Sequence, residues 1–126
     1  MVALVTTKEM LAAARQGRYA VGAFNIENME MAQAVLAAAE NKQAPVIVQT
    51  TPGTLRYAPP ELFLANVAAI ARQASVPVAM HLDHGSSYAL ASRAYRAGYT
   101  SIMIDGSALS LEENIALTKS VVELCD

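Results

Sequence analysis

The sequence predicts an α/β fold in which buried parallel strands alternate with amphipathic helices. Two observations support this prediction. Short apolar runs rich in Val, Ile and Ala recur roughly every 25 to 30 residues, which is the size of a βαβ unit. These runs also lack strict alternation of apolar and polar residues, which is typical of parallel strands covered on both faces.

The expected elements follow one another as a helix and then four strand–helix units. The opening helix is expected at Thr7–Arg15, because Gly17 follows it. The four apolar runs are expected to form strands at Tyr19–Phe24, Pro45–Gln49, Pro77–His81 and Ser101–Ile104. The helices between and after them are expected at Asn28–Asn41, Pro60–Ala74, Ser86–Ala97 and Leu111–Leu124.

Local signals place the ends of three of these helices. Pro60 suits a first helical turn, where its missing N–H would have no partner anyway. Gly98 fits a C-terminal cap, because glycine adopts a left-handed backbone without strain. Ser110 and Glu113 have the spacing of a capping box at the start of the last helix.

Composition limits the class of protein. The chain has 126 residues, of which 54% are hydrophobic, so it is long and apolar enough to form a core. A net charge of −2 without a basic run argues against nucleic-acid binding. The apolar runs are shorter than the roughly 18 residues that cross a membrane, and no signal-peptide pattern is present, so a cytoplasmic location is expected. Cys125 is the single cysteine, which excludes an internal disulfide framework.

Two architectures suit this order of elements. One is an open, doubly wound sheet, and the other is a (β/α)₈ barrel, which needs about 250 residues. Four units are half of such a barrel and would leave two apolar strand edges open. We therefore expect the chain either to pair with something or to be a portion of a longer protein.

Polar side chains gather where the expected strands end. They are Asn25 after the first strand, Gln49, Thr50 and Thr51 at the second, His81, Asp83 and His84 at the third, and Asp105 and Ser107 after the fourth. Each residue alone has an ordinary explanation as a loop or helix-cap residue. Because parallel α/β folds place their sites at the carboxyl ends of strands, the four ends together favour a functional site.

The segment His81–His84 contains both histidines of the chain. A neutral imidazole is a common zinc ligand, and a neighbouring carboxylate such as Asp83 can orient it or exchange a proton with a substrate. A zinc site needs three or four protein ligands, however, so a hydrogen-bonded His–Asp turn remains the alternative. Thr51–Thr54 has the composition of a turn, which we favour over an anion-binding loop.

Several motifs together identify a family resemblance. Val21–Asn25, Ala44–Ile47, His81–Gly85 and Ser101–Ser107 resemble segments of the class II fructose- and tagatose-bisphosphate aldolases. Leu111–Ile115 is similar to the helix that follows in that family. The similarity covers essentially all 126 residues in order and spacing, and the pairing of His-x-Asp-His with Met-x-Asp-x-Ser is specific.

The resemblance implies a (β/α)₈ TIM barrel, of which residues 1–126 would be the N-terminal half, with four β/α units after a short helix. It implies a dimeric or tetrameric zinc enzyme that cleaves a ketose 1,6-bisphosphate into dihydroxyacetone phosphate and glyceraldehyde 3-phosphate. Some members also use a monovalent or second divalent cation. The other zinc histidines and the phosphate-binding loops lie in the second half, so residues 1–126 alone are expected to be inactive.

Residue roles follow from the matching positions. His84 resembles one of three zinc-ligating histidines, and Asp83 resembles the residue that handles the proton of the substrate C4 hydroxyl. Asp105 resembles a residue near the second cation position. Asn25 and Thr51 match polar positions that line the active site. His81 belongs to the motif but is not expected to be a catalytic zinc ligand.

The chemistry of the reaction explains the need for a metal. Cleavage of the C3–C4 bond leaves an enediolate, whose charge a zinc ion stabilises as a Lewis acid. Metal-free aldolases use a Schiff-base lysine instead. The only lysines are Lys8, Lys42 and Lys119, none at an expected strand end, which disfavours that route. The Thr51–Thr54 segment is closer to the tagatose branch than to the fructose branch.

Two other classes of function compete with an aldolase. One is a non-catalytic half-barrel that binds or interacts with another protein. The other is a flavodoxin-like domain, which requires five strands and a Gly-rich phosphate loop after the first strand. Asn25–Glu27 stands at that position and contains no glycine, which disfavours the flavodoxin-like class.

Overall fold

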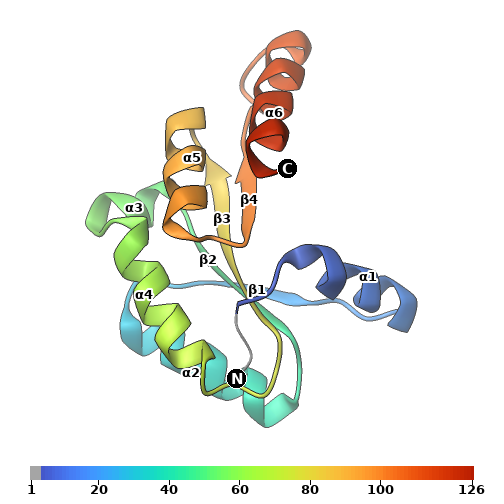
Figure 1. The fold of residues 1–126 in the computed structure, drawn as a ribbon, viewed down its shortest axis with the longest axis vertical. Coiled ribbons are helices and arrows are strands. Elements are labelled where there is room, and N and C mark those ends of the chain that lie inside the picture. The colour runs from blue at the N-terminus through green and yellow to red at the C-terminus, as the bar shows by residue number, and fades with distance from the viewer. Residues whose placement is uncertain (1–3) are drawn as a thin grey trace.

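A computed structural model describes residues 4–126 and contains one parallel sheet (Figure 1). Its strands are β1 (Gly22–Asn25), β2 (Val46–Thr50), β3 (Val78–Gly85) and β4 (Ser101–Ile104), in the order β1-β2-β3-β4. This confirms the predicted α/β class and the parallel sheet. The strand order does not reverse within residues 4–126, whereas doubly wound and flavodoxin-like sheets contain such a reversal.

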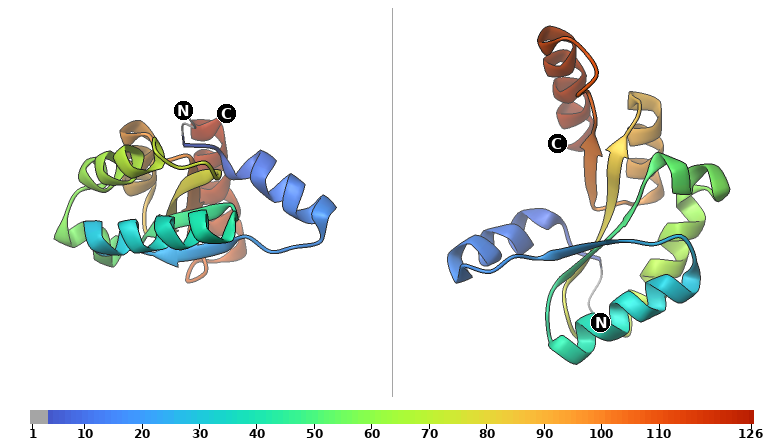
Figure 2. Two further views of the ribbon diagram at one scale, coloured as in Figure 1. Left: turned by 90° about the horizontal axis from the view of Figure 1, so that it is seen from below. Right: turned by 180° about the vertical axis from the view of Figure 1, so that it is seen from behind.

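Six helices accompany the described strands. They are α1 (Thr7–Gly17), α2 (Met29–Lys42), α3 (Pro52–Tyr57), α4 (Pro60–Ala71), α5 (Tyr88–Ala97) and α6 (Leu111–Cys125). Figures 1 and 2 show α2, α4 and α5 on one side of the sheet and α1 on the other. Within residues 4–126, no helix is both long and apolar enough to cross a membrane.

The alternation of side chains along the central strands creates two apolar layers. Val48, Met80 and Leu82 point to the helix side and are fully buried in the main core, which α2, α4 and α5 cover. Ile47 and Ala79 point the opposite way and form a second, smaller core with Met10 of α1.

The outer strands differ from the prediction that all strands are buried on both faces. Every residue of β1 is exposed and β4 is only partly covered, whereas β2 and β3 are largely buried. The reason is position, because β1 and β4 are the two edges of the sheet. Beside β1, an apolar groove runs along α2 and is lined in part by Phe24, Val35 and Ala38.

Several predicted boundaries are wrong at the level of a few residues. The first strand begins at Gly22, because the chain leaves α1 through the left-handed Arg18 and stays irregular until then. The expected turn at Thr51–Thr54 is instead the start of α3, where Thr51 is the N-cap and Pro52 occupies the first turn. The third strand continues through Gly85, so the His-x-Asp-His segment lies within β3 rather than after it.

Three predicted end signals are confirmed, although α4 ends at Ala71 rather than Ala74 and α1 includes Gly17. Pro60 lies in the first turn of α4, and Gly98 caps α5 with a φ of 108°. At α6 the Ser110 hydroxyl accepts from the Glu113 N–H, and the Glu113 carboxylate accepts from the Ser110 N–H.

The capping box gives a measurable contribution to stability. Ser110→Ala is expected to lower the free energy of unfolding by about 1 kcal/mol, because the first turn of α6 loses the hydroxyl acceptor. Urea unfolding measures this loss. The matched control is Ser120→Ala in the same helix, where the hydroxyl only donates back to the Leu117 carbonyl. That control is expected to change stability little, since such back-bonding does not support a helix.

Candidate functional site

Strand register places a row of polar residues across the sheet on the face opposite α2 and α4. Asn25, Gln49, His81 and Ser101 are successive register partners on β1, β2, β3 and β4. Asp83 lies two residues beyond His81 on β3 and therefore on the same face. Four of the polar residues predicted at separate strand ends, Asn25, Gln49, His81 and Asp83, are thus brought together.

A chain of side-chain hydrogen bonds links the first three strands. The Gln49 Nε2 donates to Asn25 Oδ1 at 2.6 Å and to Asp83 Oδ2 at 2.9 Å. The Asp83 side chain is only 20% exposed, whereas Asn25 is exposed at the end of β1. The sheet therefore presents one carboxylate with one oxygen already held by an amide.

An irregularity in β3 brings His84 to the same place. In a regular strand, His84 would point away from Asp83, because neighbouring side chains alternate between faces. The pairing of β3 with β4 shifts between Leu82 and Gly85, and His84 has a left-handed φ of 54°. As a result His84 Nε2 lies 3.8 Å from Asp83 Oδ1. Non-glycine residues adopt this backbone rarely, and such outliers cluster at functional sites.

Gly85 makes this irregularity possible. A Cβ at position 85 would lie 2.7 Å from the Met103 carbonyl oxygen of β4, which is too close for any side chain. The Gly85 carbonyl in turn accepts from the Asp105 N–H at 2.9 Å, which ties the end of β4 to the end of β3. Only glycine lets the two backbones approach closely enough to bring Asp105 beside His84.

His84 and Asp105 form a short hydrogen-bonded pair. His84 Nδ1 lies 2.7 Å from Asp105 Oδ2, and the Ser107 N–H donates to Asp105 Oδ1 at 3.0 Å. The bond from His84, reinforced by Ser107, holds the pKa of Asp105 far below its ordinary value. The same bond, together with the charge of Asp83, raises the pKa of His84. Asp105 is therefore ionised at neutral pH.

The ionised Asp105 fixes the tautomer of a neutral His84. A carboxylate only accepts hydrogen bonds, so Nδ1 carries the proton and Nε2 keeps its lone pair. Nε2 is the nitrogen that faces Asp83, at a distance too long for a hydrogen bond. A histidine held by a carboxylate in this way is the usual arrangement of a zinc-ligating imidazole.

His81 is engaged in a different network. Its Nδ1 lies 2.7 Å from the Ser101 hydroxyl, which also accepts from the Thr7 hydroxyl of α1 at 3.2 Å. Burial lowers the pKa of His81, which favours the neutral ring. His81 therefore ties β3 to β4 and to α1, below the site.

Thr51 stands apart from this network. Its hydroxyl accepts from the Thr54 N–H at 3.4 Å and lies 3.2 Å from the Thr54 hydroxyl, so it caps α3. Thr54 in turn donates to Glu27 Oε1 at 2.8 Å, which joins α3 to the loop after β1. Among the described hydrogen bonds, none connects Thr51 to Asp83 or His84.

The donor set fits part of a zinc site. His84 offers a free Nε2 and has a carboxylate partner, as a zinc ligand requires. Within residues 4–126, however, no group of three or more His, Cys, Asp or Glu side chains is arranged to hold a metal ion. Both Asp105 oxygens already have partners, which makes this residue a support for His84 in the described geometry.

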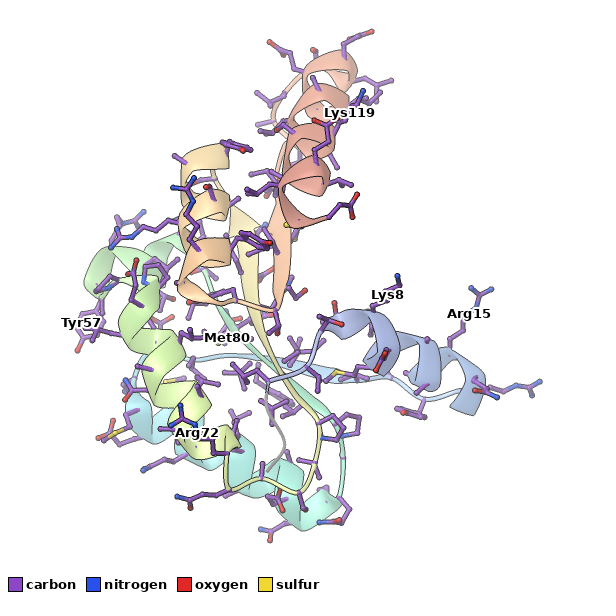
Figure 3. The ribbon with its side chains drawn as sticks, viewed as in Figure 1. Lys8, Arg15, Tyr57, Arg72, Met80 and Lys119 are labelled. Atoms are coloured by element: carbon purple, nitrogen blue, oxygen red, sulfur yellow. The ribbon has the colours of Figure 1, made fainter. Side chains whose placement is uncertain are left out.

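The three lysines lie on helices rather than at the carboxyl ends of the strands. Lys8 on α1 and Lys119 on α6 extend away from the sheet (Figure 3), and Lys42 lies in the last turn of α2. A Schiff-base mechanism therefore has no lysine at the carboxyl ends of these strands.

Fold and site together define the class of protein. The parallel sheet carries a carboxylate, a carboxylate-held histidine and amides at the carboxyl ends of its strands, where α/β folds place their sites. Residues 5–126 match the family described as "Fructose-bisphosphate aldolase class-II". The chain belongs to the class II fructose-bisphosphate aldolase family.

Individual relatives agree with this assignment. The chain is 50% identical over 120 residues to the fructose-bisphosphate aldolase of Thermus caldophilus. This match covers 95% of this chain and 39% of that protein. The YdjI aldolase from Escherichia coli K12 has a similar structure, with a TM-score of 0.89 and 37% identity over 95% of this chain and 46% of that one. The structure of the Campylobacter jejuni fructose-bisphosphate aldolase is also similar, with a TM-score of 0.82 and 25% sequence identity. That match covers 97% of this chain and 44% of the Campylobacter jejuni protein. The chain thus spans less than half the length of these relatives.

Proposed function

We propose that this chain is the N-terminal half of a (β/α)₈ barrel that catalyses zinc-dependent aldol cleavage of a ketose 1,6-bisphosphate. The products are dihydroxyacetone phosphate and glyceraldehyde 3-phosphate. The observation that carries the proposal is the convergence of Asp83, His84 and Asp105 at the ends of β3 and β4. A carboxylate that can exchange a proton, next to an imidazole free to bind a metal, supplies two of the groups that metal-assisted cleavage of a carbon–carbon bond uses.

Completion of a barrel is supported by the two edges of the sheet. β1 and β4 each lack a neighbour on one side within residues 4–126. The groove between β1 and α2 is apolar, and α6 exposes Leu111, Ile115 and Val122 next to β4. In a closed barrel both surfaces are covered by further β/α units. That cover accounts for the low charged fraction of 16%.

Each residue has a role in the proposed reaction. Asp83 exchanges the proton of the C4 hydroxyl through Oδ1, because Oδ2 is held by Gln49. His84 would hold the zinc through Nε2, with Asp105 orienting that ring, and Asp105 would also serve a second or monovalent cation. Zinc, when bound, supplies the Lewis acid that stabilises the charge left on the dihydroxyacetone half. Asn25 and Thr51 contact the substrate.

Three further assignments extend this proposal. The Thr51–Thr54 segment favours tagatose over fructose bisphosphate as substrate. Assembly into a homodimer or homotetramer is proposed for the whole protein. A cytoplasmic location is proposed, because it fits a phosphorylated sugar substrate. We expect neither a membrane nor a nucleic acid as a partner.

The test is an assay of the full-length protein that contains residues 1–126. Purified protein is expected to cleave fructose or tagatose 1,6-bisphosphate, to lose activity after treatment with a chelator and to regain it with zinc. A higher kcat/KM for tagatose would support the assignment drawn from Thr51–Thr54. Protein that binds no zinc and cleaves neither substrate would contradict the proposal and favour the non-catalytic half-barrel.

A further inference from the structure

We infer that Gln49 is a positioning residue that holds the Asp83 carboxylate and fixes the direction of the Asn25 amide. This inference rests on the function proposed above. Neither Gln49 nor this network follows from the motif that marks Asp83 and His84. The Gln49 amide is half-buried between β1 and β3 and donates from one nitrogen to both neighbours.

The chemistry of the three groups sets the direction of the whole chain of hydrogen bonds. A carboxylate only accepts, so the Gln49 amide must turn its NH₂ group toward Asp83. The second N–H of the same group then points to Asn25, which must present its oxygen. The NH₂ group of Asn25 is therefore free to donate elsewhere. The acceptor-only carboxylate of Asp83, acting through Gln49, thus determines that Asn25 offers its N–H donors rather than its oxygen to a ligand.

The outcome is a matched pair of groups at the open end of the sheet. Asn25 offers N–H donors from an exposed position, and Asp83 offers the acceptor Oδ1. A polyhydroxylated substrate such as a ketose phosphate carries hydroxyls that need both kinds of partner. Asn25 and Gln49 are register partners on β1 and β2, and Gln49 pairs in turn with His81 of β3. The sheet therefore sets the spacing between Asn25 and Asp83.

Gln49→Met in the full-length protein tests this role by removing both donors while keeping the length of the side chain. We expect kcat to fall about 10- to 100-fold with little change in KM, since a misplaced catalytic carboxylate slows the chemical step. Gln49→Glu is expected to be slower still, because it places a second carboxylate beside Asp83. Gln33→Met, at an exposed position of α2, is the matched control and is expected to behave as wild type.

A double substitution separates positioning from simple packing. If Gln49 acts through Asp83, then Gln49→Met lowers kcat in the wild type but adds nothing in an Asp83→Asn background. Additive losses in the two backgrounds, or wild-type kcat for Gln49→Met, would overturn the inference.

A spectroscopic readout keeps the inference testable even if no ketose bisphosphate is cleaved. The side-chain amide protons of Gln49 are assigned by their absence in Gln49→Met. They are expected to shift in both Asp83→Ala and Asn25→Ala and to stay unchanged in Gln33→Met. Shifts in an inactive wild type would refute the aldolase proposal but keep the Gln49 network, whereas unshifted signals would refute the network itself.

Discussion

Asp83→Asn in the full-length protein is expected to lower kcat for aldol cleavage by about 10²- to 10⁴-fold, the usual contribution of a proton-transfer group. This corresponds to about 3 to 5 kcal/mol of activation free energy. The physical reason is that an amide cannot take up the proton of the C4 hydroxyl. Asparagine keeps the shape of the side chain, and its oxygen can still accept the hydrogen bond that Gln49 donates at 2.9 Å.

The measurement is steady-state cleavage together with zinc content and KM. Zinc content and KM are expected to change little, because His84, Asp105 and Asn25 remain in place. Glu9→Gln, an exposed carboxylate of α1, is the matched control and should leave kcat unchanged. Wild-type kcat in a zinc-loaded Asp83→Asn protein would show that another group moves the proton.

The features of the fold that sequence could predict are those encoded within a single element. The apolar runs, Pro60, Gly98 and the pair Ser110 and Glu113 each act over a few residues, and the structure agrees with them. The helix α3 could not be predicted, because a segment that starts Thr51-Pro52-Gly53 has the composition of a turn. Whether this segment forms a turn or a helix depends on Thr54, which is buried and donates a hydrogen bond to Glu27 in another loop.

The features of the site that sequence could not predict depend on contacts between strands. Position after an apolar run was enough to mark Asp83, His84 and Asp105 as candidates. The role of Gln49 depends on register, which pairs it with Asn25 and His81 and becomes visible only once the strands are aligned. The left-handed backbone of His84 accompanies the shift between β3 and β4, and Gly85, which allows that shift, does not by itself reveal it in the sequence.

That left-handed backbone also determines the best variant for testing the metal site. His84→Asn is expected to weaken zinc binding by more than about 100-fold, since loss of even an outer partner of a ligand costs 10 to 100-fold. Asparagine tolerates a φ of 54° better than alanine does, so the shift between Leu82 and Gly85 should persist. Its amide oxygen is not a usual zinc ligand. Zinc loss would then report the missing imidazole rather than a rearranged strand.

His81→Asn supplies the matched control, because the two histidines lie three residues apart on β3 with different partners. His81 contacts Ser101 below the site, so its substitution is expected to lower stability but to leave zinc bound. Zinc content after dialysis, measured beside aldol cleavage, separates the two variants. If His84→Asn retains zinc and His81→Asn loses it, then His81 is the zinc ligand and His84 has the structural role. The hydrogen bond between His84 and Asp105 would then only hold β3 to β4. The His84 imidazole that faces Asp83 would have no part in binding the metal.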